Sequence, residues 1–242
     1  IVIKIAMIGA GSVGFTRKLA ADVLAVPELA DTEFRFMDIS EENLRMAADL
    51  SRKMIADNGL PATIVDTTDR REAIAGADYV VSTVRVGGLE AFAHDVEIPL
   101  KYGVDQCVAD TLGPGGIFYG LRTIPVILDI WADMRDLAPD ALFLNYSNPM
   151  AMNSWAARRA GGVRFLGLCH GVEGGHALIA KSLGLPLEEV NIICAGINHQ
   201  TWYIQVTHQG KDMLPFLLEA MENDPEIRER EPARIDILRR FG

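Results

Sequence analysis

Cysteine is scarce in this sequence, which has three among its 242 residues, at Cys107, Cys169 and Cys194. Such an odd and sparse set does not make a disulfide framework and indicates a reducing compartment. Long apolar runs are missing as well, because no stretch approaches the ~20 residues of a membrane-spanning helix. We therefore predict a cytoplasmic protein that does not enter a membrane.

Positive charge is also in short supply. The 23 lysines and arginines are outnumbered by 33 aspartates and glutamates, which leaves a formal net charge of -10. No basic cluster offsets this balance, so we expect no nucleic-acid partner. Internal repeats and low-complexity segments are missing too. What is there, with 49% hydrophobic residues, is typical of a globular chain of one large domain or one and a half.

A glycine-rich turn follows the first apolar stretch. Residues 1–8 are predicted as a strand rather than a signal peptide, and residues 15–26 have the pattern of a helix. Between them, Gly9-x-Gly11-x-x-Gly14 has the spacing of the dinucleotide-binding fingerprint. In such a turn Gly9 permits the tight bend, Gly11 lets the backbone approach a pyrophosphate, and Gly14 lets helix and strand pack closely. The free N–H groups at the helix start would bind the phosphates.

Two further positions support a dinucleotide site. Asp38 ends a second predicted strand, 33–37, close to the roughly 20-residue spacing expected for the carboxylate that binds the ribose of NAD, and its charge repels the 2′-phosphate of NADP. Arg85 follows the strand predicted at 79–84, whose end faces the cofactor in a doubly wound sheet. The alternatives are a purely structural glycine turn and an ordinary loop after residue 84.

Two asparagines follow the apolar run at residues 141–144. Asn145 and Asn148 carry amides, which donate and accept at once and so suit the paired hydroxyls of a sugar or a hydroxy acid. Pro149 favours an extended backbone at Asn148, so a helix is expected to follow from about residue 150. We predict substrate contact for both asparagines. The alternatives are a helix cap at Asn148 and a role for Asn145 in bracing the turn.

A thiol and two imidazoles follow the next apolar runs. Cys169 and His170 come after a strand predicted at 163–168, and His199 comes after a strand predicted at 190–195. A thiolate and an imidazole suit a first-row divalent metal, so Cys169 and His199 are candidate ligands of an open site that substrate and water complete. His170 is a candidate general acid or base. The alternatives are a small buried hydrophobe at Cys169 and a Cys/His nucleophile pair.

Strands and helices alternate along the chain, which predicts an α/β fold. We expect a Rossmann-type doubly wound parallel sheet like that of lactate and malate dehydrogenases, followed by part of an α+β substrate domain. The dinucleotide-binding domain is placed at residues 1–168 and the incomplete second domain at residues 169–242. Helices are also predicted at 41–58, 69–75, 91–102, 117–137, 150–160, 173–183, 211–223 and 226–241, with a glycine-proline loop at 110–116.

Five motifs then follow one another along the chain: Gly9-x-Gly11-Ser12, Asp110-Thr111-Leu112-Gly113-Pro114-Gly115-Gly116, Asn145-Tyr146-x-Asn148-Pro149-Met150, Cys169-His170-Gly171 and Gly196-Ile197-Asn198-His199. Together they resemble glycoside hydrolase family 4, the NAD- and manganese-dependent glycosidases, and within it most of all the α-galactosidases. The resemblance covers essentially the whole chain.

The resemblance implies a reaction and its cofactors, which are NAD and Mn²⁺ or another divalent first-row metal. NAD⁺ takes a hydride from C3 of an α-linked glycoside, most of all an α-galactoside. The C2 proton leaves with metal assistance, the C1–O bond breaks by elimination, water adds and the hydride returns. The implied roles are metal binding by Cys169 and His199, contact with the sugar hydroxyls by Asn148, lining of the sugar site and handling of the leaving-group proton by Asp110, and dinucleotide binding by Gly9, Gly11, Ser12 and Asp38.

Members of that family are much longer than this chain. The resemblance therefore places the residue that removes the C2 proton beyond Gly242, together with much of the second domain. We also expect a homodimer or homotetramer. Two alternatives stay open: an NAD-dependent 2-hydroxy acid dehydrogenase of the lactate/malate type, and an inactive NAD-binding module. Against the dehydrogenase, Arg85 and Arg122 have no obvious His–Asp partner in the sequence.

Overall fold

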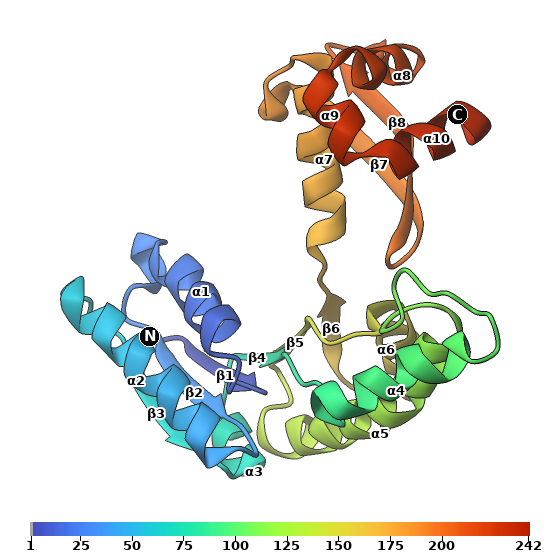
Figure 1. The fold of residues 1–242 in the computed structure, drawn as a ribbon. Helices are drawn as coiled ribbons and strands as arrows, with labels where there is room; N and C mark the ends of the chain where they lie inside the picture. The colour runs from blue at the N-terminus through green and yellow to red at the C-terminus, as the bar shows by residue number, and fades with distance from the viewer. Residues whose placement is uncertain (1) are drawn as a thin grey trace. The chain divides into compact units, whose positions relative to one another are not determined.

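The computed structural model describes residues 2–242, and the chain divides into two compact units (Figure 1). The first ends at Leu168 and the second runs from Cys169 to Gly242. Ile1, which the first predicted strand includes, lies outside the described residues. None of the helices within residues 2–242 combines the length and the apolar character that crossing a membrane requires.

The first unit is built on a six-stranded sheet in the order β3-β2-β1-β4-β5-β6, and every neighbouring pair is parallel. The order reverses between β1 and β4, which is where open α/β sheets of this kind bind dinucleotides. The predicted Rossmann-type doubly wound sheet is therefore confirmed. Its strands are β1 (Lys4–Ile8), β2 (Glu33–Met37), β3 (Thr63–Thr67), β4 (Tyr79–Ser82), β5 (Leu142–Asn145) and β6 (Arg164–Gly167).

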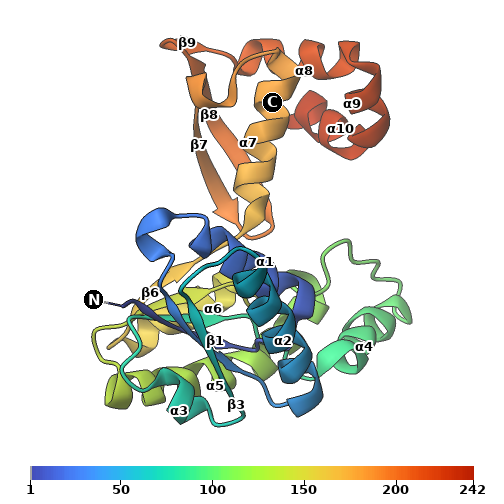
Figure 2. The same cartoon turned by 90° about the vertical axis from the view of Figure 1, so that its left-hand side faces the viewer.

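Helices cover both faces of this sheet, because the central parallel strands are apolar on both sides (Figure 2). One face packs on α1 and α2 through a cluster that includes Phe34 and Phe36. The other packs on α3, α5 and α6 around Trp131, whose ring meets Phe143 edge-on at 5.7 Å. The helices are α1 (Val13–Leu24), α2 (Glu41–Asp57), α3 (Arg70–Ile74), α4 (Gly88–Leu100), α5 (Gly113–Leu137) and α6 (Met150–Ala160), with a 3₁₀ turn at Pro27–Leu29.

The second unit is a small α+β unit, as predicted. Its antiparallel sheet, in the order β7-β8-β9, packs on α7 and α8 around a core that includes Ile179, Val206 and Leu217. The elements are α7 (His170–Leu183), a 3₁₀ turn (Leu187–Glu189), β7 (Val190–Ile197), β8 (Gln200–His208), β9 (Lys211–Asp212), α8 (Leu214–Asn223), α9 (Pro225–Arg230) and α10 (Pro232–Phe241).

Several predicted elements have other bounds in the structure, and three of these differences change the architecture. The single helix expected over 226–241 is two helices, because Pro232 has no N–H to continue α9 and begins α10 instead. The helix expected from residue 211 begins only at Leu214, after a short strand. In the glycine-proline loop, Gly113 to Gly116 already belong to α5, whose first turn accommodates Pro114.

Candidate functional site

The glycine turn joins β1 to α1 in a space that only glycine fits. The N–H groups of Gly9 and Ala10 both donate to the carbonyl of Met37 at 2.9 Å. Gly9 has φ +90°, and a Cβ atom there would lie 2.9 Å from backbone atoms of Thr83 and Val84. Since these neighbours are backbone and cannot turn aside, a side chain at Gly9 would push β1 and β4 apart at the point where the strand order reverses.

Asp38 is tied to the same turn by backbone donors. The Gly11 N–H donates to Asp38 Oδ2 at 2.8 Å, and the Ser40 N–H donates to Asp38 Oδ1 at 2.9 Å. A Cβ atom on Gly11 would lie 2.7 Å from Asp38 Oδ2. These backbone bonds hold the carboxylate in a set orientation beside Gly11. The approach of a pyrophosphate to Gly11 stays a prediction.

Gly14 does not do what its place in the motif predicts. It is exposed in the first turn of α1, and a Cβ atom there would meet no heavy atom within 4 Å. The close helix–strand packing expected at the third glycine is therefore wrong for this chain. A contact between Gly14 and a cofactor stays a prediction.

A cavity of about 930 Å³ opens at the carboxyl ends of the strands in the first unit. This volume is in the range of small-molecule and cofactor sites. Apolar side chains such as Phe15, Val84 and Tyr146 line it together with six of the predicted site residues. These six are Gly9, Gly11, Ser12, Asp38, Arg85 and Asn148.

Asn148 and Arg85 converge on one oxygen of Asp110. The Asn148 amide donates from Nδ2 to Asp110 Oδ2 at 3.1 Å, and Arg85 Nη2 lies 3.6 Å from the same oxygen. The Thr111 hydroxyl donates to the other oxygen, Oδ1, at 3.0 Å. The N-cap residue of α6 is Pro149, without a side-chain cap bond, so the alternative of Asn148 as a helix cap is wrong.

Arg85 also lies against two aromatic rings that the sequence analysis did not single out. Its guanidinium carbon is 5.0 Å from the ring centre of Phe92 and 5.9 Å from that of Tyr119, which is cation–π range. Tyr119 is 3% exposed, and this burial raises the pKa of its hydroxyl above that of an exposed tyrosine. Arg85 therefore contacts both rings and the Asp110 carboxylate.

A second arginine, Arg122 on α5, pairs with buried Asp95 and also lies near the Tyr119 ring. The Arg122 guanidinium donates to both oxygens of Asp95, which is 5% exposed, and stacks 5.4 Å from the Tyr119 ring centre. The sequence could not have revealed this pair, because it forms only where α4 and α5 pack together. An isolated Asp and Arg in two predicted helices carry no local signal of their contact.

Asn145 is placed as a brace for the turn. It is 2% exposed, its Nδ2 donates to the Ser147 carbonyl at 3.0 Å, and its Oδ1 accepts from the Ser147 N–H at 3.2 Å. Ser147 is further held by Asn153, whose Nδ2 donates to the same carbonyl at 3.0 Å. These bonds favour the bracing role for Asn145, and its contact with substrate stays a prediction.

The second unit brings Cys169 and His199 to the same glycine. Cys169 is the N-cap residue of α7, and its Sγ accepts from the Gly171 N–H at 3.3 Å. A Cβ atom on Gly171 would lie 3.4 Å from Cys169 Sγ and 4.0 Å from His199 Cδ2. Exposed His170 is the first residue of α7. The thiol and the imidazole thus flank one small residue from two different elements.

This pair fits a divalent metal as an open site. A thiolate and an imidazole are suitable donors for first-row divalent ions. Within residues 2–242, no group of three or more His, Cys, Asp or Glu side chains is arranged to hold a metal ion. The two side chains would therefore leave coordination positions for oxygen ligands, as catalytic metal sites do.

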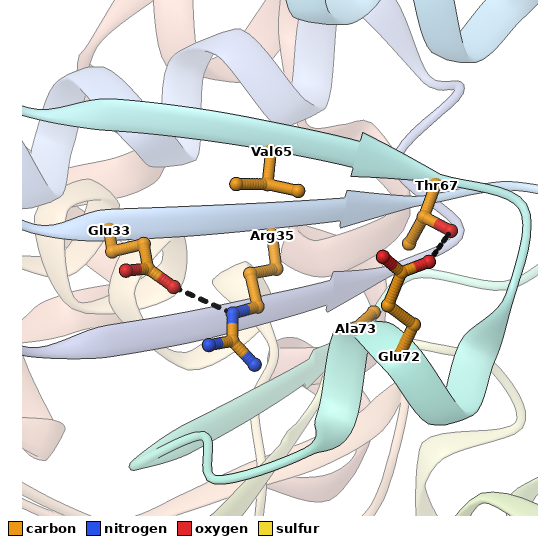
Figure 3. Close-up of a pocket in the computed structure, with 6 residues that line it drawn as sticks. All are labelled: Glu33, Arg35, Val65, Thr67, Glu72 and Ala73. Atoms are coloured by element: carbon orange, nitrogen blue, oxygen red, sulfur yellow. Dashed lines mark hydrogen bonds and ion pairs between the residues drawn. The ribbon is translucent and has the colours of Figure 1, made fainter.

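A second, smaller cavity of about 220 Å³ lies on the sheet of the first unit (Figure 3). Arg35 donates from Nε to Glu33 Oε1 at 2.7 Å, and the Thr67 hydroxyl donates to Glu72 Oε2 at 2.6 Å. These polar groups are already paired with one another, and none of the predicted site residues lines the cavity. It is therefore not the candidate site.

The strand order and the glycine turn define an α/β protein with a Rossmann-type doubly wound sheet, the fold of the lactate and malate dehydrogenases. A malate dehydrogenase structure from Salinibacter ruber matches with a TM-score of 0.63 over 94% of this chain and 64% of that one, at 17% identity, which shows the fold alone. The model of the Family 4 glycosyl hydrolases matches residues 4–185, and that of the family's C-terminal domain matches residues 194–242. The chain belongs to family 4 of the glycosyl hydrolases.

Two relatives show how far the similarity extends. An α-galactosidase from Rhizobium meliloti (strain 1021) is 54% identical over 241 residues, which are 99% of this chain and 49% of that protein. A 6-phospho-β-glucosidase structure from Thermotoga maritima, solved with manganese, NAD⁺ and glucose-6-phosphate, is 27% identical with a TM-score of 0.81 over 93% of this chain and 53% of that one. The chain spans about half the length of these relatives.

Proposed function

We propose that this chain belongs to a glycosidase that hydrolyses α-linked glycosides, most of all α-galactosides, with NAD and a divalent metal such as Mn²⁺. The observation that carries this proposal is the cavity of the first unit, which is lined by the glycine turn, by Asp38 and by Asn148. A dinucleotide site and a hydroxyl-binding amide in one cavity are what oxidation of a sugar by NAD requires. The 54% identity to an α-galactosidase supports the substrate.

The first unit would hold NAD through its glycine turn. Gly9, Gly11 and Ser12 leave room for the pyrophosphate at the start of α1, whose first N–H groups bind phosphate oxygens. The Asp38 carboxylate would accept hydrogen bonds from the ribose hydroxyls and repel a 2′-phosphate. Arg85 lines the same cavity and would face the cofactor from the end of β4.

The second unit would hold the metal through Cys169 and His199, with oxygen atoms of the substrate in the open positions. When bound, NAD⁺ would supply a hydride acceptor and donor for C3 of the sugar, and the metal ion would supply the positive charge that makes the C2 proton acidic. A thiolate ligand survives only where cysteine stays reduced, which supports a cytoplasmic location. A homodimer or homotetramer is part of the same proposal.

Asn148 and Asp110 would handle the sugar. Asn148 would orient the hydroxyls at C2 and C3 through its amide, which is already directed to Asp110. Asp110 would hold the proton that the leaving-group oxygen receives as the C1–O bond breaks. His170, exposed at the start of α7, is the second candidate for proton transfer.

The test is hydrolysis of nitrophenyl α-galactoside in the presence of NAD⁺, Mn²⁺ and a thiol reductant. We expect hydrolysis without net NADH, and loss of hydrolysis when either NAD⁺ or the metal is removed. Activity that survives complete removal of both would contradict the mechanism. Net NADH from a 2-hydroxy acid would indicate a dehydrogenase, and NAD⁺ binding with neither activity would indicate an inactive NAD-binding module.

A further inference from the structure

A tyrosine links the two elements that carry the proposed metal ligands. The Tyr203 hydroxyl, on β8, donates to the Val172 carbonyl at 2.8 Å and lies 3.3 Å from the Gly171 carbonyl, both in the first turn of α7. We propose that Tyr203 is a positioning residue that fixes Cys169 relative to His199. This inference rests on the proposed metal site.

Helix α7 has a glycine, Gly175, where the Tyr203 ring packs against it. A Cβ atom on Gly175 would lie 1.9 Å from the Tyr203 hydroxyl oxygen and 2.6 Å from Cζ of the ring. A Cβ atom on the neighbouring Gly174 would meet no heavy atom within 4 Å. Glycine inside a helix costs about 1 kcal/mol relative to alanine. At Gly175 this cost is offset by the contact that the missing side chain permits.

The link acts on the thiol through the first turn of α7. Cys169 precedes this turn, and its Sγ accepts from the Gly171 N–H, so the orientation of the thiol follows the orientation of the turn. Tyr203 bonds the carbonyls of Gly171 and Val172 in that same turn. A movement of the turn away from β8 would therefore break the tyrosine bond and carry the thiol with it.

The link acts on the imidazole through β8. His199 stands directly before β8, at the turn where Ile197 pairs with Gln200, and Tyr203 follows four residues later. Tyr203 also pairs with Cys194 across the sheet, so its position is set by both strands of the hairpin. The buried core residues Ile179 and Val206 belong to a later turn of α7 and to the far half of β8, and the Tyr203 ring packs against the same core.

Metal binding depends on the spacing of the ligands. The bonds from a first-row metal to sulfur and nitrogen are short, about 2.3 Å and 2.0–2.1 Å for zinc. If the first turn of α7 and the start of β8 moved independently, their relative position would have to be fixed before both bonds could form. Residues that orient metal ligands typically contribute about 10- to 100-fold to metal affinity. A link through the backbone of α7 is less direct than a bond to a ligand, so we expect an effect near the lower limit, about tenfold.

The test is a Co²⁺ titration of the whole chain, followed by the thiolate-to-cobalt absorption band and by competition with Mn²⁺. Tyr203→Phe removes only the hydroxyl. Ser182→Ala is the matched control, since its hydroxyl donates to the Leu178 carbonyl at 2.8 Å in the same helix, away from the first turn. We expect about tenfold weaker Co²⁺ binding for Tyr203→Phe and wild-type binding for Ser182→Ala, with similar melting temperatures.

The adjacent glycines give a second comparison. Gly174→Ala should bind Co²⁺ as the wild type does, whereas Gly175→Ala displaces the tyrosine and should weaken binding at least as much as Tyr203→Phe. Should Gly175→Ala fail to fold, Tyr203→Phe still decides the question. Wild-type affinity in Tyr203→Phe, or an equal loss in Ser182→Ala, would overturn the positioning role while leaving the metal site in place. A wild-type band that is missing, or that persists in Cys169→Ser, would overturn the metal site itself.

Discussion

Asn148 donates a hydrogen bond of 3.1 Å from Nδ2 to Oδ2 of Asp110, a residue 38 positions earlier in the chain. The bond joins the turn after β5 to the segment before α5. It also directs the amide away from the helix that follows. Asn148 therefore lines the cavity with a side chain whose orientation is already set, and its removal should weaken substrate binding.

Asn148→Ala should lower kcat/KM for an α-galactoside by about 2- to 10-fold while leaving NAD⁺ affinity nearly unchanged, because one hydrogen bond between a neutral amide and a sugar hydroxyl is worth about 0.5–1.5 kcal/mol. Steady-state kinetics and an NAD⁺ binding titration measure the two effects. Asn58→Ala is the control, since Asn58 loses a single bond to the Met54 carbonyl at the end of α2. Full activity in Asn148→Ala would contradict the contact between Asn148 and the substrate.

Asp38→Asn should weaken NAD⁺ binding by about tenfold, because a neutral amide accepts more weakly from the ribose and faces two backbone donors with one oxygen and one NH₂ group. Discrimination against NADP⁺ should fall at the same time, since the negative charge is gone. Isothermal titrations with both dinucleotides measure this. Asp57→Asn, which affects an exposed pair with Lys53 on α2, is the control. Unchanged preference for NAD⁺ in Asp38→Asn would exclude Asp38 as the discriminating residue.

Gly9→Ala and Gly14→Ala should differ although both belong to one motif. At Gly9 the new Cβ atom meets the backbone of Thr83 at 2.9 Å and the backbone must keep φ +90°, so we expect a loss of about 2 kcal/mol or more in the free energy of unfolding. At Gly14 the Cβ atom meets open space in a helix, so we expect a gain of about 0.4–1 kcal/mol. Urea denaturation of the two variants measures both values. Equal destabilisation of the two variants would contradict the open space at Gly14 and support the close packing that the motif predicts there.

Tyr119 should ionise later than exposed tyrosines in an alkaline titration, because burial raises the pKa of its hydroxyl. The folded state keeps its proton while the unfolded state loses it. The stability that this difference contributes is therefore present below the ordinary tyrosine pKa of about 10 and is lost as pH rises through the folded pKa. Absorbance at 295 nm counts the tyrosines that titrate late. Tyr119→Phe should remove one of them, and Tyr203, whose pKa burial also raises, should persist as another. An unchanged count in Tyr119→Phe would mean that Tyr119 is not among them.

Much of the fold could be predicted from local patterns. The apolar runs and their spacing predict the parallel sheet, because buried parallel strands and amphipathic helices have distinct periods. The glycine turn could be predicted at Gly9 and Gly11, because each needs room that a side chain would fill. The break before Pro232 was missed, since a charged amphipathic pattern continues across it while the backbone cannot.

By itself, the sequence determined the order of strands and helices, the site of the glycine turn and the polar residues that follow each strand, because these depend on neighbours within one or two turns of the chain. Only the tertiary structure decided which of those residues meet. Asp110 contacts Asn148 and Arg85, and Arg122 pairs with Asp95. The Tyr203 ring packs against α7 where Gly175 has no side chain. Each contact joins segments that are distant in sequence, so it exists only once helices and strands have packed, and no local pattern encodes it.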